Sequence, residues 1–261
     1  MDMNFTNKVV VVTGASKGIG LAVSQAFAAE GAHVIAGARN NTAELQALEA
    51  AGSATFVAAD LSTPDGPRAL IAVAAERGGI DVLVNNAGAV TPRFDGILSV
   101  TDEDWDAALA VNFLSAVRTT REAIPHMLAR GGGSVVMIGS VNATLPEWNI
   151  VDYSATKAAL ASFAKSVSKE FGPKGIRVNT VSPGPVSTDL WLGDGGVAAQ
   201  FATISGATPD EIVASAVAGS ATQRFTTAQE VADLTLFLAS ERSANTTGAD
   251  VRIDGGYITT I

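Results

Sequence analysis

The 261-residue sequence predicts an α/β fold, a doubly wound parallel sheet with helices on both faces in a single domain, and three observations predict it. Short runs rich in β-branched residues alternate with stretches of helical apolar spacing, which is typical of a parallel sheet. The runs are apolar almost throughout, which indicates burial on both faces of the sheet. The length suits one domain, and no repeat or low-complexity linker indicates a second. The expected strands cover residues 9–12, 33–36, 55–57, 82–84, 134–138, 177–181 and 250–253.

End signals define several of the expected helices. The apolar stretch 21–30 stops at Gly31, and a later apolar helix stops at Gly131, because glycine is favoured just after the last helical turn. A helix start is indicated where a hydroxyl residue precedes an acid by three positions, since the two can cap one another. Two such starts are Thr101 with Asp104 and Thr227 with Glu230.

About forty residues between the sixth strand and the helix at Thr227 break the alternation. Unstructured loops of this length are usually functional or disordered. We expect a small, partly helical flap over residues 186–220 that closes over an apolar ligand, although disorder without ligand leaves the same signature. The large apolar residues of this segment include Trp191, Leu192, Phe201, Ile204, Ile212 and Val213.

Composition excludes several classes of function. The chain has no cysteine, and its two histidines, His33 and His126, lie far apart, so we expect no metal site. A net charge of −9 argues against nucleic-acid binding. The N-terminal residues do not resemble a signal peptide, and no apolar run approaches the roughly 20 residues of a membrane span. We therefore expect a cytoplasmic protein that does not bind membranes.

A glycine-rich turn follows the first strand, at Gly14-Ala15-Ser16-Lys17-Gly18-Ile19-Gly20. Glycines at a strand-to-helix turn let backbone amides approach a pyrophosphate at the positive end of the helix dipole. The spacing differs from Gly-x-Gly-x-x-Gly, and a tight turn without a ligand is the alternative. Asn85-Asn86-Ala87-Gly88 follows the fourth strand and would lie beside this turn, where ligands of such sheets bind.

The end of the second strand indicates which dinucleotide is bound. NAD-binding proteins place a carboxylate there to hold the ribose hydroxyls, but this chain has Gly37-Ala38-Arg39-Asn40. Arg39 and Lys17 can instead clamp a 2′-phosphate, so we predict NADP(H) rather than NAD(H). Solvated surface charges are the alternative. Asp60 ends the third strand, where it can accept from an adenine amino group or cap the next helix.

Tyr153 and Lys157 lie four residues apart, on one face of an expected helix. A nearby ammonium favours the phenolate, so we expect Lys157 to lower the pKa of Tyr153 and to allow acid–base chemistry near neutrality. A surface pair is the common alternative for so short a motif. Asn112 belongs to an apolar helical face and should point inward, where its amide needs partners.

The glycine-rich turn, Asn86-Ala87-Gly88, Asn112, Ser140 and Tyr153-x-x-x-Lys157 occur in this order, followed by Pro183-Gly184. In this combination the chain resembles the short-chain dehydrogenase/reductase family in its single-domain form. The resemblance implies a Rossmann-type sheet of seven strands and a nicotinamide cofactor. It implies the catalytic residues Asn112, Ser140, Tyr153 and Lys157, with Asn112 holding a water that connects Lys157 to solvent. A structural hydrogen bond is the alternative for Asn112. The implied cofactor-binding residues are Gly14, Ser16, Lys17, Gly18, Ile19, Gly20, Arg39, Asp60, Leu61, Asn86, Ala87, Gly88, Tyr153, Lys157, Pro183, Gly184, Val186 and Thr188.

Bulky residues near Ser140 and in the flap predict an apolar substrate pocket, which favours a hydrophobic ketone or secondary alcohol. We therefore expect an NADP(H)-dependent carbonyl reductase or alcohol dehydrogenase acting on a small molecule. The alternatives are a 3-oxoacyl-thioester reductase and a non-catalytic dinucleotide sensor. Apolar helices and the apolar end 257–261 predict a homo-oligomer. The family resemblance implies a tetramer first and a dimer second. The expected pocket residues are Val141, Trp148, Trp191, Leu192 and Phe201.

Overall fold

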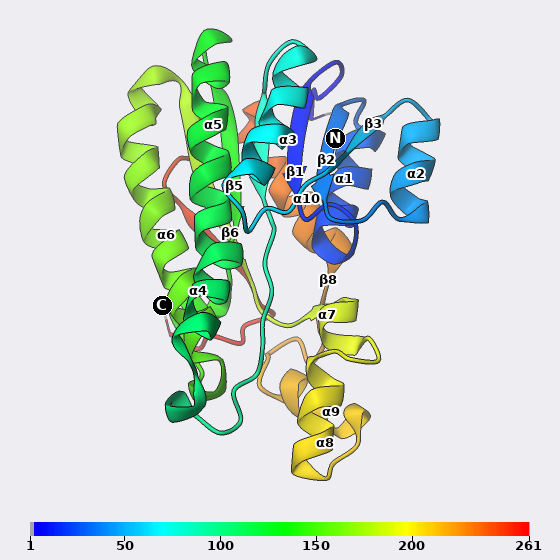
Figure 1. Ribbon diagram of the computed structural model, residues 1–261, viewed down its shortest axis with the longest axis vertical. Coiled ribbons are helices and arrows are strands. Elements are labelled where there is room, and N and C mark those ends of the chain that lie inside the picture. The colour runs from blue at the N-terminus through cyan, green and yellow to red at the C-terminus, as the bar shows by residue number, and fades with distance from the viewer. Residues whose placement is uncertain (1–2, 261) are drawn as a thin grey trace.

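The computed structural model describes residues 3–260 and is built around one seven-stranded parallel sheet (Figure 1). The strand order is β3-β2-β1-β4-β5-β6-β9, so the order reverses between β1 and β4. All seven predicted strands are confirmed, each within two residues of the expected bounds. They are β1 Val9–Thr13, β2 His33–Ala38, β3 Ala54–Ala58, β4 Val82–Asn85, β5 Gly133–Ile138, β6 Ile176–Pro183 and β9 Asp250–Ile253.

Strand β1 shows why the sheet is covered on both sides. Val10 and Val12 belong to one apolar core, and Val9 and Val11 belong to the other. Successive side chains of a strand point to opposite faces, so an apolar run supplies both cores at once. The helices with core residues on the first face are α1 Gly18–Ala29, α2 Ala43–Ala50 and α10 Ala228–Ala239; those on the second are α3 Asp65–Glu76, α5 Ser115–Ala129 and α6 Val151–Phe171.

The predicted helix ends are confirmed at the capping residues. Thr101 caps α4 (Asp102–Leu109) and Thr227 caps α10, each in a reciprocal capping box with the acid three residues later. Gly31 and Gly131 follow α1 and α5 with positive φ angles of 81° and 86°, which favour glycine. Helix α1 begins three residues earlier than expected, directly within the glycine-rich turn.

The segment 186–220 is ordered into short helices, as the prediction of a partly helical flap required. It contains β7 (Val186–Ser187) and three helices, and β7 pairs with β8 (Thr226–Thr227) at the base of the segment. Figure 1 shows α8 and α9 extending beyond the end of the sheet. The three helices are α7 Asp189–Leu192, α8 Val197–Ser205 and α9 Pro209–Ala218.

The carboxyl ends of β1 and β4 meet where the strand order reverses. In open α/β sheets this position leaves a crevice, because the neighbouring connections run to opposite faces. Within residues 3–260, no helix has the length and hydropathy needed to cross a bilayer, and no cluster of ligating side chains could hold a metal ion. The last residue of the apolar end, Ile261, lies outside the described residues.

Candidate active site

A cavity of about 820 Å³ opens at the carboxyl edge of the sheet. Its volume lies within the range of small-molecule and cofactor sites. One end is formed by the glycine-rich turn and the ends of β2 and β3, and the other by the flap and the residues around Ser140 and Tyr153. The structure therefore brings together the two groups of residues that the sequence predicted for cofactor and substrate.

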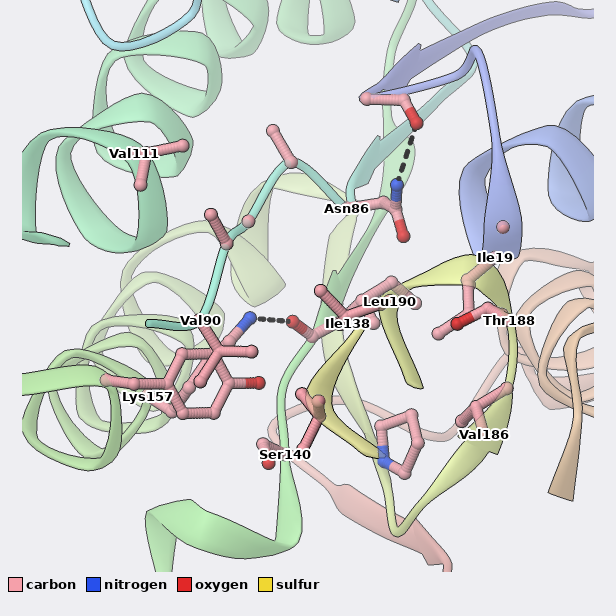
Figure 2. Close-up of a pocket in the computed structure, with 18 of the residues that line it drawn as sticks. Ile19, Asn86, Val90, Val111, Ile138, Ser140, Lys157, Val186, Thr188 and Leu190 are labelled. Atoms are coloured by element: carbon pink, nitrogen blue, oxygen red, sulfur yellow. Dashed lines mark hydrogen bonds between the residues drawn. The ribbon is translucent and has the colours of Figure 1, made fainter. Parts of the chain in front are cut away.

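The conformation of the glycine-rich turn is fixed by Asn86 and by close packing of its backbone against Gly20. Asn86 donates from Nδ2 to the carbonyl oxygens of Thr13 (2.9 Å) and Gly14 (3.2 Å), as Figure 2 shows in part. A Cβ atom on Gly20 would lie 2.2 Å from the Gly14 oxygen and 2.4 Å from Asn86 Nδ2. Gly14 and Gly18 have positive φ angles of 66° and 55°. The turn therefore requires these glycines, and Gly20 lies beneath it rather than on the cavity wall.

Lys17, in the turn between β1 and α1, and Arg39, directly after β2, both line the cavity and are exposed. Within residues 3–260 neither side chain makes an ion pair or a hydrogen bond, so both cations face the cavity and solvent. Asp60 lines the same end, and its Oδ1 accepts from Ser62 N (3.0 Å) and Ser62 Oγ (2.7 Å). These bonds, with a smaller contribution from Arg39, lower the pKa of Asp60. Asp60 thus shapes the turn before α3 and still faces the cavity with Leu61.

Tyr153 and Ser140 meet at the other end of the cavity wall. Tyr153 lies in the first turn of α6, and Ser140 follows β5. The Ser140 hydroxyl lies close enough to the phenol of Tyr153 to lower its pKa, although burial has the larger, opposite effect. The Ser140 hydroxyl also donates to Asn142 Oδ1 (3.1 Å) and accepts from Asn142 N (3.2 Å), which holds its side chain in place. The phenol and the hydroxyl can therefore reach one oxygen atom of a ligand from two directions.

Lys157 lies one turn after Tyr153 and is only 3% exposed. Its Nζ donates to the Ile138 carbonyl oxygen at 2.8 Å (Figure 2) and lies 5.6 Å from the centre of the Tyr153 ring. Burial lowers the pKa of Lys157 to about 8. The structure therefore confirms that Tyr153 and Lys157 lie close together on one face of α6, as their spacing predicts.

The electrostatic consequence differs from the expectation. Burial raises the pKa of Tyr153, and the opposing effect of the Ser140 hydroxyl is smaller. Burial disfavours the phenolate of Tyr153 and the ammonium of Lys157 alike, so it raises the first pKa and lowers the second, and the net shift of Tyr153 is upward instead of downward. The sequence argument counted the charge of Lys157 and had no measure of the burial of either group.

Asn112 is 1% exposed and lies in a π-helical turn, η2 (Ala110–Leu114), which links α4 to α5. Such turns are frequent at functional sites. Its Oδ1 accepts from Ala89 N at 2.9 Å, while its Nδ2 is buried with no partner within residues 3–260. A Cβ on Gly88 would lie 3.0 Å from Asn112 Oδ1 and 3.6 Å from Lys157 Nζ. Asn112 thus ties down the loop after β4 close to Lys157, and it leaves one polar group unsatisfied there.

The expected substrate residues are only partly confirmed in position. Val141, Trp191 and Phe201 line the cavity. Trp191 packs edge-on against Phe225, and Phe201 packs edge-on against Phe94. Trp148 and Leu192 do not line it and are 66% and 50% exposed, which corrects the prediction for both. Each lies in a short helical turn from which a different residue faces the cavity. In the turn of Trp148 that residue is Ile150, and in the turn of Leu192 it is Trp191.

Several residues of the wall were missed in the sequence. They lie in the loop after β4, in α4 and η2, beside Ser140, just before β7 and in the C-terminal segment. Single small aliphatic residues in loops carry no sequence signal, so only the three-dimensional structure could identify them. These residues are Val90, Pro92, Ala107, Ala110, Val111, Asn142, Pro185 and Tyr257. The wall also includes Glu147, Asn149 and Ile150 of the loop before Tyr153 and Asp189, Leu190, Val197 and Ala216 of the flap, two segments that were expected to line the pocket.

The remaining predicted residues lie where a dinucleotide would be held. Thr188 faces the glycine-rich turn, since a Cβ on Gly18 would lie 3.5 Å from the Thr188 side chain. A pyrophosphate can come close to the backbone at Gly14, Gly20 and Gly88, where no side chain intervenes. The cations of Lys17 and Arg39 suit a further phosphate. The other members of the predicted set on the cavity wall are Ser16, Ile19, Ala87, Pro183, Gly184 and Val186.

Comparison with known proteins supports this arrangement. A family model described as enoyl-(acyl carrier protein) reductase matches residues 14–258. D-threitol dehydrogenase of Mycolicibacterium smegmatis is 36% identical, with 98% of this chain and 95% of that protein covered. The 3-oxoacyl-[acyl-carrier-protein] reductase FabG of Escherichia coli is 32% identical, with 97% and 98% covered.

The same architecture is found in solved structures. The crystal structure of L-sorbose reductase from Gluconobacter frateurii, complexed with NADPH and L-sorbose, has a TM-score of 0.91 and 35% identity, and each chain is covered completely. The matches extend over nearly the full length of the sequence, so the matched range spans the positions of the motifs described above. The chain therefore belongs to the short-chain dehydrogenase/reductase family of oxidoreductases, which act on CH–OH or C=O groups.

Proposed function

We propose that the protein is an NADP(H)-dependent carbonyl reductase or the corresponding alcohol dehydrogenase, acting on a hydrophobic ketone or secondary alcohol. One observation carries the proposal: Tyr153, Ser140 and Lys157 meet on the wall of the cavity whose other end holds the glycine-rich turn. A nicotinamide bound along this cavity would supply or accept the hydride. The chain's own residues would manage the proton and the charge on the substrate oxygen.

In the reductive direction, negative charge grows on the carbonyl oxygen. Tyr153 donates its proton to that oxygen, and Ser140 donates a second hydrogen bond that orients the carbonyl. Because its pKa is raised by burial, Tyr153 carries its proton at neutral pH, and the negative charge that develops on the substrate oxygen draws that proton across. Lys157 and Asn112 would return a proton to Tyr153 through a water near the unpartnered Asn112 Nδ2, a role that remains a prediction.

The preference for NADP(H) rests on the two cations at the end of β2. Lys17 and Arg39 line the cavity, and the acid at this end, Asp60, has one oxygen engaged by Ser62. A charge-assisted hydrogen bond contributes about 1.5–3 kcal/mol, so Arg39→Ala should weaken NADPH binding roughly 10- to 100-fold. NADH binding should change less than about three-fold, since it lacks the phosphate. If fluorescence titrations showed that Arg39→Ala loses the same affinity for NADPH as for NADH, the proposed clamp on the 2′-phosphate would be refuted.

The substrate class rests on the apolar wall beside Tyr153, formed by Val90, Val111, Leu190, Trp191 and Phe201. Such a wall favours an apolar substrate body, with the hydroxyls of Tyr153 and Ser140 fixing its oxygen. The test is the consumption of NADPH with matched ketones, keto sugars and 3-oxoacyl thioesters, and of NADP⁺ with secondary alcohols and polyols. Higher kcat/KM for keto sugars or polyols than for the hydrophobic members would refute the substrate class.

A 3-oxoacyl-thioester reductase is the second candidate, favoured by the full-length similarity to FabG. The net charge of −9 disfavours docking of an acidic carrier protein, unless a local basic surface offsets it. Turnover of a 3-oxoacyl thioester at least ten-fold above the ketones would favour this candidate. Coenzyme binding without any turnover, unchanged in Tyr153→Phe, would instead indicate a dinucleotide sensor.

A further inference from the structure

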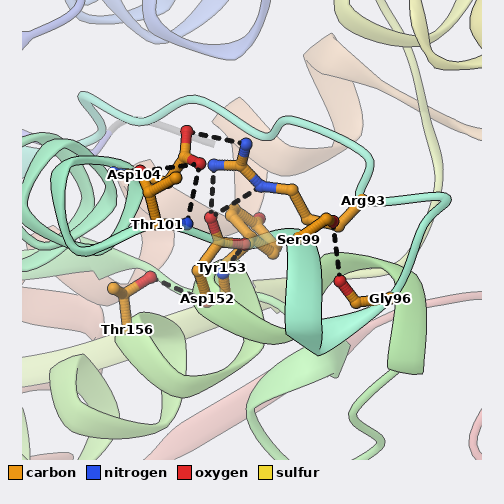
Figure 3. Close-up of polar contacts among 8 residues, drawn as sticks. All are labelled: Arg93, Gly96, Ser99, Thr101, Asp104, Asp152, Tyr153 and Thr156. Atoms are coloured by element: carbon orange, nitrogen blue, oxygen red, sulfur yellow. Dashed lines mark hydrogen bonds and ion pairs between the residues drawn. The ribbon is translucent and has the colours of Figure 1, made fainter.

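A single guanidinium joins the two helices that lead to the site residues (Figure 3). Arg93, in the loop after β4, donates from Nε (3.1 Å) and Nη2 (2.7 Å) to Asp152 Oδ2. Its Nη1 donates to Asp104 Oδ1 at 2.9 Å. The side chains of Arg93 and Asp152 are 15% and 3% exposed. Because the pair is shielded from water, its geometry is far better defined than that of a surface ion pair.

Each carboxylate lies in the first turn of its helix. Asp152 Oδ1 accepts from the backbone N–H of Tyr153 at 2.9 Å, so Asp152 holds the residue that carries the phenol. Asp104 closes the capping box of α4 by accepting from Thr101 N at 3.1 Å. Helix α4 runs directly into the π-helical turn that carries Asn112. Arg93 therefore connects the helix of Tyr153 and Lys157 with the helix that leads to Asn112.

The loop that carries Arg93 also forms part of the cavity. Val90 and Pro92 line it, and the backbone N–H of Arg93 donates to the Asn149 carbonyl oxygen at 2.6 Å. Asn149 lines the cavity as well. The bonds of Arg93 thus hold together two loops of the cavity wall and two helix starts, and none of its donors faces the cavity.

We propose that Arg93 is a positioning residue, which fixes Tyr153 relative to Asn112 and to the wall of the substrate pocket by clasping Asp152 and Asp104. The proposal rests on the proposed function, since it assigns Arg93 a part in the turnover that Tyr153 performs. Proton transfer and hydride transfer depend on alignment, and a displacement of about 1 Å can cost roughly 100-fold in rate. A planar guanidinium presents its donors in a rigid fork and therefore holds two carboxylates in a defined geometry, which the rotatable donors of an ammonium do not fix.

The test compares Arg93→Gln with Arg130→Gln. Arg130 is the matched control, because it donates to Asp81 Oδ1 at 2.9 Å and to the Gly78 carbonyl oxygen at 2.6 Å at the opposite edge of the sheet. For both variants we would measure Tm, the Kd of NADPH, and kcat and KM with the best substrate of the panel. Crystal structures of the wild type and Arg93→Gln would give the distance between the hydroxyls of Tyr153 and Ser140.

We expect Arg93→Gln to lower kcat at least ten-fold, to leave the Kd of NADPH within two-fold, and to lengthen the Tyr153–Ser140 distance. Arg130→Gln should lower Tm comparably and leave kcat within two-fold. The proposal is overturned if kcat of Arg93→Gln stays within two-fold, if both variants lose kcat equally, or if NADPH binding falls in parallel with kcat.

Two further variants keep the test decisive if Arg93→Gln does not fold. Asp104→Asn retains an oxygen for the helix cap but removes the carboxylate that pairs with Arg93, so it should lower kcat three- to ten-fold. Arg93→Lys should show an activity between those of the wild type and Arg93→Gln. Unchanged kcat in Asp104→Asn would overturn the proposal. Should the wild type turn over none of the substrates, the proposed function fails, while the distance between the two hydroxyls still tests the clasp.

Discussion

The ionisation of Tyr153 can be measured directly, because the chain contains only two tyrosines. In a Tyr257→Phe background, Tyr153 is the single residue whose phenolate absorbs near 295 nm. The Tyr257 hydroxyl has no hydrogen-bond partner within residues 3–260, so its replacement by phenylalanine should preserve packing. The structure predicts a midpoint above the ordinary value of 10, because burial of the phenol raises its pKa.

The magnitude of the Lys157 contribution follows from its distance to the ring. At 5.6 Å, two unit charges attract by about 0.7 kcal/mol in water and by about 3 kcal/mol at an effective dielectric constant of 20. These energies correspond to about 0.5 to 2 pH units. However, the pKa of Lys157 is about 8, so its amine is neutral before a phenol with a pKa above 10 ionises. We therefore expect Lys157→Met to move the Tyr153 midpoint by less than about 0.5 pH units.

The assay is a spectrophotometric titration of Tyr257→Phe with and without Lys157→Met, from pH 8 to 12. Far-UV circular dichroism at each pH excludes unfolding as the source of the absorbance change. A midpoint below 10 that rises by 1 to 2 pH units in Lys157→Met would refute this reasoning. The charge of Lys157 would then dominate over burial, as the spacing of the motif alone suggests.

Other consequences of the structure can be checked independently. Gly20→Ala places a Cβ 2.2 Å from the Gly14 oxygen, so it should abolish NADPH binding in fluorescence titrations, whereas Gly172→Ala, with no atom within 4 Å of the new Cβ, should bind normally. Lys157→Met should be more stable at pH 7 by up to about 3 kcal/mol in urea unfolding, since the folded pKa of about 8 lies below the unfolded value of 10.5. The unfolded chain then binds more protons between these values, so wild-type stability should rise from pH 8 to 10.5 relative to the variant, and a fall would contradict the burial argument. The apolar helix surfaces predict a homo-oligomer, and a monomeric mass in light scattering at micromolar concentration would contradict it.

Local patterns determined much of the fold. The continuous apolar runs, the capping pairs at Thr101 and Thr227, and the glycines after α1 and α5 each act within a few residues, so they specify strands and helix ends without knowledge of the whole. Alternation of strands and helices then leaves few ways to connect a parallel sheet, because crossovers are right-handed and short. The position of the cavity followed, since the strand order reverses beside the glycine-rich turn.

Only the tertiary structure decided those properties that depend on contacts between residues far apart in the sequence. The exposure of Trp148 and Leu192 and the inward position of Val90 depend on how loops pack, and the pKa values of Tyr153 and Lys157 depend on the burial that this packing creates. The clasp of Arg93 on Asp104 and Asp152 joins residues up to 59 positions apart. Sequence spacing shows which residues share a helix face, but burial and long-range contacts arise only when the chain folds and its helices and loops pack together.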